Sequence, residues 1–255
     1  MQKLLGMLLA LLISSLSIHA QKLVVDSLPG KVKTYFSPGR LNRAKATQQL
    51  IQDAVSFYEK RFPTKAFSVP VYVVDKVQVP FYDDSSHYLA VGSIPQLMAA
   101  GRRLTVTATS PADTVDLIAL HELGHYFLTT LHQAPIRVQW ANEFFATYFA
   151  ICYLQTKGIS LLDSSSTGRQ PTYRPTYRSL ADFERLYYKV GGANYGWYQE
   201  QFAHLGYELY PKFKTRLVQI AIAEYGPSGR KTSPMALLER LAPRTMQAWR
   251  KRLQP

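Results

Sequence analysis

The pentapeptide His121-Glu122-Leu123-Gly124-His125 constrains this chain more than any other stretch. Positions four apart on an α-helix lie on one face, about 6 Å from each other, so both imidazoles could bind one cation. Glu122 would then lie beside the open position of the metal. A zinc ion lowers the pKa of a bound water to about 7, and a neighbouring carboxylate can take up the released proton. The motif therefore predicts a helix that carries a hydrolytic zinc site.

The residues around the motif favour a helix. Ser110 is placed as an N-cap, Pro111 as the first helical position, and Asp113 as an acidic residue of the first turn. Apolar residues then recur with helical spacing up to about His132, which we expect at a surface helix end rather than at the metal. The apolar positions are Leu117, Leu120, Phe127 and Leu131.

Two histidines leave the metal one protein ligand short, because catalytic zinc commonly has three and keeps one position for water. Glu143 is the candidate for the third ligand. It lies near the start of a second expected helix, which runs from about Trp140 to Lys157 and is stopped by Gly158. The apolar run that follows Glu143 predicts burial, and an unpaired buried carboxylate would be costly, so a metal partner explains this residue well.

The sequence HELGH followed by WANEFFATY resembles the gluzincin metallopeptidases, and most of all the aminopeptidase N family, in which the second element reads approximately WLNEGFA. The resemblance implies that His121, His125 and Glu143 bind one zinc ion and that Glu122 is the general base. It also implies an α+β, thermolysin-like zincin domain. In such a domain an N-terminal mixed sheet precedes the zinc-binding helices and a helical C-terminal half.

A further segment, residues 194–202, looks like the tyrosine-glycine segment of the same family. In that family a tyrosine hydroxyl donates a hydrogen bond to the oxyanion that forms when water attacks the scissile carbonyl. The resemblance assigns this role to Tyr195, with Tyr198 as the alternative.

The chain departs from the family at two places. The Gly-x-Met-Glu-Asn strand that holds a substrate's amino terminus is absent, and the corresponding residues 101–109 offer cations and no carboxylate. This segment alternates like a strand and could pair with an extended substrate. Because it has no carboxylate to hold a free amino terminus, we expect endopeptidase rather than aminopeptidase action. Thr147 stands where thermolysin-like relatives have an aspartate that orients a histidine, and its hydroxyl could serve the same purpose.

Residues 1–20 have the pattern of a signal peptide, with one early lysine and an apolar run that is shorter than the roughly 20 residues needed to span a bilayer. We expect cleavage after Ala20, with an uncleaved anchor as the alternative, and a secreted or periplasmic protein. Residues 21–255 then form a single domain. Cys152, the one cysteine, is expected to be a buried packing residue and excludes an intramolecular disulfide.

The remaining elements are expected to be strands at 32–36, 67–75 and 104–108 and a helix at 41–62, with Pro70 marking a sheet edge or a strand start. Residues 158–178 read as a loop. From Trp197 onward the pattern is helical, with breaks expected at Pro211, Pro227 and Pro243.

The formal net charge of +13 comes from cations scattered along the chain, so we expect loose association with anionic surfaces but no specific nucleic-acid binding. The leading hypothesis is an exported zinc peptidase that acts on peptide or protein substrates. One alternative is a zinc-containing protein that binds peptide or cell-wall polymer without hydrolysing it. Another is a basic protein that adheres to nucleic acid or membrane.

Overall fold

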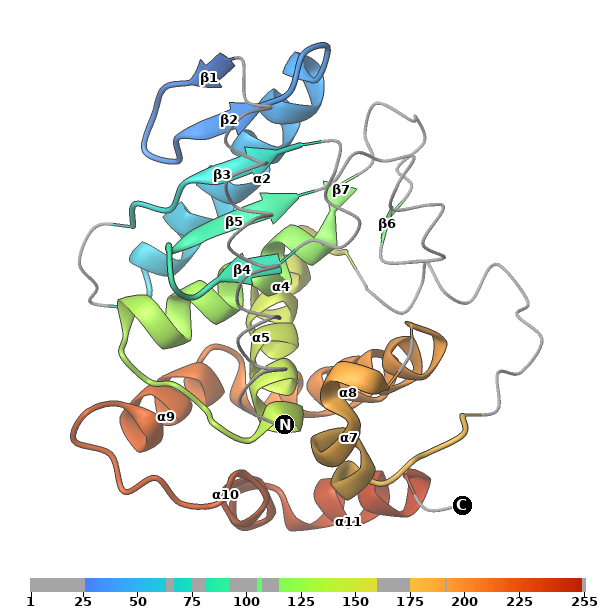
Figure 1. Cartoon of the computed structure of the whole chain (residues 1–255). Coiled ribbons are helices and arrows are strands. Elements are labelled where there is room, and N and C mark those ends of the chain that lie inside the picture. The colour runs from blue at the N-terminus through green and yellow to red at the C-terminus, as the bar shows by residue number, and fades with distance from the viewer. Residues whose placement is uncertain are drawn as a thin grey trace.

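A small mixed sheet with helices packed against it forms the N-terminal half of the protein (Figure 1). The computed structural model describes residues 26–62, 67–74, 81–91, 105–106, 115–159, 175–190 and 192–253. The strand order is β1-β2-β3-β5-β4; β2, β3 and β5 are parallel, whereas β1 and β4 run antiparallel to their neighbours. The strands are β1 (Asp26–Leu28), β2 (Thr34–Phe36), β3 (Val71–Val73), β4 (Phe81–Asp83) and β5 (Tyr88–Val91).

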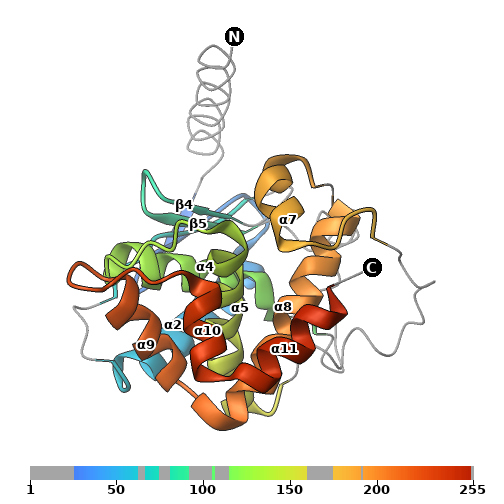
Figure 2. The same ribbon diagram turned by 90° about the horizontal axis from the view of Figure 1, so that it is seen from below.

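Helices make up the rest of the described chain. Helices α2 and α4 contact the sheet, α5 packs on α4, and α8 packs on α5. Helices α10 and α11 lie on the far side of α5 from the sheet (Figures 1 and 2). The α-helices are α2 (Leu41–Glu59), α4 (Leu117–His125), α5 (Gln139–Leu154), α7 (Leu180–Leu186), α8 (Gly192–Phe213), α9 (Arg216–Tyr225), α10 (Pro234–Leu241) and α11 (Pro243–Arg252).

Helix α5 is the centre of the hydrophobic core. Almost all of its side chains are buried, because it lies between α4 on one side and α8 on the other. It ends as the sequence predicts: a 3-10 turn, η3 (Gln155–Lys157), leads to Gly158, whose φ of 67° suits glycine and closes the helix. Cys152 is fully buried in this helix, which confirms its role as a packing residue.

The start of helix α4, which carries the His121–His125 motif, differs from the prediction. Val115–Asp116 form strand β7, which pairs antiparallel with β6 (Thr105–Val106), so the helix begins at Leu117 and not near Ser110. Pairing with β6 satisfies the backbone of β7 in place of a helical turn. Of the strand expected at 104–108, only 105–106 lie among the described residues, and Ser110, Pro111 and Asp113 lie outside them.

The same helix ends near the expected residue but with a different geometry. After His125 the chain continues as a π-helix, η2 (Tyr126–Leu131), in which the His132 amide donates to the Phe127 carbonyl. His132 is partly buried against the Phe127 ring rather than exposed at a surface helix end.

The prolines lie as expected with one exception. Pro211 does not break a helix: it lies inside α8, which continues to Phe213, because a proline so close to the end removes only one hydrogen bond of the last turn. Pro70 precedes β3, a central strand that is shorter than the expected 67–75, and so marks a strand start and not an edge. The breaks expected at Pro227 and Pro243 are present, because Pro227 lies between α9 and α10 and Pro243 begins α11.

The predicted signal peptide, residues 1–20, lies outside the described residues. Within the part of the chain that is described, no helix is both long and apolar enough to cross a membrane.

Candidate metal centre

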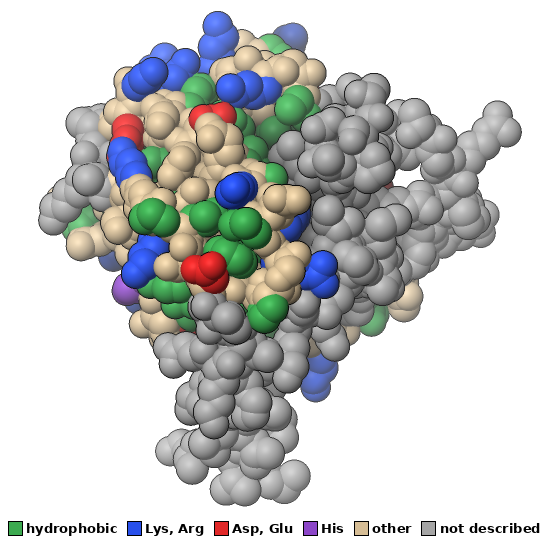
Figure 3. Space-filling model, turned by 90° about the horizontal axis from the view of Figure 1, so that it is seen from above, with side chains coloured by type: hydrophobic (Ala, Val, Ile, Leu, Met, Phe, Trp, Pro, Cys, Tyr) green, Lys and Arg blue, Asp and Glu red, His purple; other side chains and the backbone are tan. Residues whose placement is uncertain are grey.

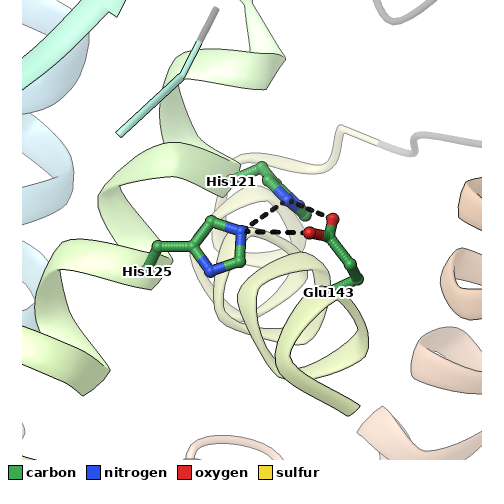
Figure 4. Close-up of side chains that lie close together, drawn as sticks. All are labelled: His121, His125 and Glu143. Atoms are coloured by element: carbon green, nitrogen blue, oxygen red, sulfur yellow. Dashed lines mark hydrogen bonds and ion pairs between the residues drawn. The ribbon is translucent and has the colours of Figure 1, made fainter. Parts of the chain in front are cut away.

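Two neighbouring helices bring three ligand side chains together. His121 and His125 project from successive turns of α4, and Glu143 projects toward them from the first turns of α5 (Figure 4). The two Nε2 atoms lie 3.0 Å apart. Glu143 Oε2 lies 3.1 Å from Nε2 of His121, and Oε1 lies 3.8 Å from Nε2 of His125. The side chains predicted as ligands therefore converge on one point.

This arrangement fits a single metal ion. The three ligand atoms all lie within 4.8 Å of one another. In a tetrahedral zinc site with bonds of 2.0–2.1 Å, neighbouring donors are about 3.3 Å apart, close to the spacings of this triad. Two imidazoles and one carboxylate are also a donor set that zinc accepts at catalytic sites. His121, His125 and Glu143 are thus a possible metal-binding triad.

Each histidine is held by a second contact through its other ring nitrogen. Nδ1 of His121 lies 3.1 Å from Oγ1 of Thr147, and Nδ1 of His125 lies 3.3 Å from Oδ1 of Asn142. Such contacts fix the orientation of a metal-binding imidazole and leave its Nε2 directed at the metal. The Thr147 contact agrees with the sequence-based expectation, whereas Asn142, although next to Glu143, received no role from the sequence.

The Glu143 carboxylate accepts three further hydrogen bonds. Its Oε1 accepts from the Tyr187 hydroxyl. Its Oε2 accepts from the Tyr195 hydroxyl at 2.7 Å and from Nε2 of Gln199 at 2.6 Å. Tyr195 therefore lies in the centre, while its role toward an oxyanion stays a prediction. The alternative, Tyr198, does not: its hydroxyl donates to the Ser179 carbonyl at 2.8 Å.

Sequence reasoning missed Tyr187 and Gln199. A signal for Gln199 existed, because it follows Tyr195 by four residues and so shares its face of α8. Tyr187 lies in a separate 3-10 helix, η4 (Tyr187–Lys189), and no local pattern marks it.

Burial and mutual charge set the protonation states in the centre. Burial alone would raise the pKa of the Glu143 carboxyl, but the hydrogen bond from His121 and the charges of both histidines hold that pKa well below its usual range. Burial lowers the pKa of His125 to about 4. The centre thus presents an ionised carboxylate and a neutral His125, the forms that bind metal ions.

The Glu122 side chain extends from α4 to the edge of the sheet. Its Oε2 accepts a hydrogen bond from the backbone N–H of Tyr82 in β4 at 2.9 Å. Burial and the Glu143 charge raise the pKa of Tyr195. Glu122 directly follows His121 on α4, so it is close to the same centre. The predicted base is therefore adjacent to the triad without belonging to it.

A scan against protein-family models and searches of curated proteins and of solved structures find no match to this chain. The functional argument therefore depends on the geometry and chemistry of the centre.

Proposed function

We propose that this protein is an exported, zinc-dependent peptidase of the gluzincin type with a thermolysin-like catalytic domain. The observation that carries the proposal is the convergence of His121, His125 and Glu143, with Glu122 beside them. A bound zinc ion would supply Lewis acidity and activate water as a nucleophile at neutral pH. We expect cleavage of internal peptide bonds, because the sequence lacks the glutamate with which related aminopeptidases hold a free amino terminus.

Two side chains of the chain would handle the proton and the developing charge. Glu122 takes a proton from the attacking water and passes it to the leaving amine, and the amide of Tyr82 holds this carboxylate in place. The Tyr195 hydroxyl donates a hydrogen bond to the oxyanion. Its present position against Glu143 supports this role, because it brings the hydroxyl to the metal ligands.

The alternatives are less well supported. A zinc protein that only binds peptide or polymer needs no general base, and Glu122 is present at the position of one. Adhesion to anionic surfaces would benefit from a concentrated basic patch, yet lysine and arginine side chains are spread over the described part of the face in Figure 3.

The test compares residues 21–255 with the same protein carrying Glu122→Gln. Both should bind one zinc per chain, and in a mixed peptide pool analysed by mass spectrometry only the parent should cut, at internal bonds. We expect the substitution to slow hydrolysis by about 10²–10⁴-fold, the usual contribution of a general base. A chelator should abolish cleavage, and added zinc should restore it.

Glu239→Gln is the matched control, because this glutamate lies on α10 and pairs with Arg250. It should cleave like the parent. Zinc binding without cleavage by the parent would favour a binding protein, and failure to bind zinc would remove the basis of the proposal.

A further inference from the structure

Gln199 of α8 belongs to a closed ring of hydrogen bonds that includes residues of both helices of the metal centre, α4 and α5. Its Nε2 donates to Oε2 of Glu143 at 2.6 Å, and its Oε1 accepts from Oγ1 of Thr147 at 3.2 Å. The Thr147 oxygen also lies 3.1 Å from Nδ1 of His121. Nε2 of the same imidazole lies 3.1 Å from Glu143 Oε2; in the metal-free protein it donates to this carboxylate and closes the ring.

The direction of each hydrogen bond in this ring follows from the chemistry of the groups. An ionised carboxylate can only accept, so the Gln199 amide must present its NH₂ to Glu143 and its carbonyl oxygen to Thr147. The Thr147 hydroxyl has one proton, and it donates that proton to the carbonyl oxygen. Toward His121, Thr147 is then an acceptor, and Nδ1 of the imidazole must carry a proton.

The proton on Nδ1 decides whether His121 can bind a metal. A neutral imidazole has one protonated nitrogen, and only the other nitrogen has a lone pair to offer. The triad uses Nε2 of His121, so the tautomer with the proton on Nδ1 is the required one. If the Thr147 hydroxyl were free to rotate, it could donate to Nδ1 and stabilise the opposite tautomer.

We infer that Gln199 is a positioning residue, which acts through Thr147 to keep a proton on Nδ1 of His121, so that Nε2 is the nitrogen that gives up its proton when the metal binds. This inference rests on the proposed zinc site. Glu143 and Thr147 are four residues apart on α5, so a single amide from α8 reaches both. Thr147 is 5 % exposed and Glu143 is 2 % exposed, which limits the access of water that might replace the amide.

The first test is a double-mutant cycle on zinc affinity, measured by competition with a chromophoric chelator. Thr147→Val removes the hydroxyl but keeps the shape, and we expect about 10-fold weaker binding, the lower end of the range for outer partners of metal ligands. In a Gln199→Met background the same change should have an effect of less than about twofold, because the hydroxyl is no longer oriented. Equal effects in both backgrounds would overturn the inference.

Two further variants separate orientation from packing. Thr147→Ser keeps the hydroxyl and should bind zinc within about threefold of the parent. Gln201→Met makes the same substitution as Gln199→Met, two positions further along α8 and therefore on another face, and should leave zinc affinity unchanged. A serine variant as weak as the valine variant would mean that the threonine acts through its shape.

The second test reads the Nδ1 proton directly in the zinc-loaded protein. In nitrogen-15 NMR of the histidine rings, the proton on Nδ1 of His121 should exchange slowly with water in the parent and faster in Gln199→Met, in which the Thr147 hydroxyl is no longer held as an acceptor. The same exchange rate in both proteins would overturn the inference. This readout does not depend on catalysis, so a parent that hydrolyses no peptide but shows these effects would refute the peptidase and leave the role of Gln199 standing.

Discussion

Two tyrosine hydroxyls contact the same carboxylate, one on each oxygen of Glu143, and only one of them is proposed to stabilise the oxyanion. Tyr195→Phe should lower kcat by about 100-fold, the lower end of the loss on removing one oxyanion donor. Zinc affinity should change little, because Tyr187 and Gln199 still hold the carboxylate.

The measurement is steady-state hydrolysis, at saturating zinc, of a peptide that the parent protein is found to cleave. Tyr198→Phe is the matched control, since its hydroxyl donates to a backbone carbonyl away from the centre, and it should keep the kcat of the parent. A larger loss of kcat in Tyr187→Phe than in Tyr195→Phe would assign the oxyanion contact to Tyr187 instead.

His132 should make the protein sensitive to mild acid. Its Nε2 is buried without a hydrogen-bond partner in the described structure, and burial lowers the pKa of the ring from its usual 6.5. The unfolded chain then binds more protons than the folded protein below about pH 6.5. The stability that depends on the neutral ring is complete above that pH and is lost as the pH falls toward the lowered pKa.

We therefore expect His132→Phe to lose less stability than the parent between pH 7 and pH 5. The substitution keeps a ring beside Phe127, whose centroid lies 4.4 Å from that of His132. Urea unfolding of both proteins with a chelator present gives the comparison, because it removes the pH dependence of metal binding. Parallel decreases in the free energy of unfolding would show that other groups cause the acid sensitivity.

At the scale of elements, the contact between α4 and α5 sets the distance from the histidines to Glu143. Gly124 makes this contact close: a Cβ at this position would lie 2.9 Å from both Cα and O of Ala146. Gly124→Ala should push the helices apart, reduce stability by about 1–3 kcal/mol and weaken zinc binding. Urea unfolding with chelator and zinc titration measure the two effects.

Gly196 provides the matched control on another helix. A Cβ there meets no described atom within 4 Å, and the residue lies inside α8. Gly196→Ala should therefore stabilise the protein by about 0.5–1 kcal/mol, the helical preference of alanine over glycine. If Gly124→Ala were equally harmless, the close approach of α4 and α5 would not be what positions the ligands.

The elements near the centre also show what local sequence could predict. The end of α5 at Gly158 and the ligand spacing on α4 follow from short-range rules, namely a left-handed cap and the 3.6-residue turn. Strand β7 replaced the expected first turns of the helix because its partner, β6, supplies hydrogen bonds that a local pattern does not reveal. The π-helix after His125 likewise has no simple sequence signature.

At the scale of the whole molecule, the contacts that complete the centre join distant parts of the chain. Gln199 and Glu143 are 56 positions apart, and residues 160–174 between them lie outside the described structure. Such a contact depends on how α8 packs against α5, and periodicity along either helix predicts only which face is buried. The two histidines were predictable because their spacing is local, and Glu143 was predictable because of its apolar helix and the family resemblance. The contacts of Asn142, Tyr187 and Gln199 were not predicted.

The C-terminal helix, α11, packs against both α5 and α8. Trp249 of α11 is fully buried; its ring centroid lies 6.0 Å from that of Trp140 in α5 and 6.4 Å from that of Phe202 in α8. Its Nε1 donates to the Gln201 carbonyl at 3.1 Å. One side chain thus contacts the helix that carries Glu143 and the helix that carries Tyr195 and Gln199.

Trp249→Ala should therefore reduce the free energy of unfolding by about 3–5 kcal/mol, the usual loss for a buried tryptophan, and should also weaken zinc binding. Trp249→Phe keeps a ring between the helices and should lose less stability and less zinc affinity than Trp249→Ala. Lys251→Ala, at an exposed position of the same helix, controls for the loss of helix surface. Urea unfolding with chelator and zinc competition would measure the two quantities. If Trp249→Ala lost stability but bound zinc like the parent, α4 and α5 alone would fix the centre, and the C-terminal helix would stabilise the protein without positioning its ligands.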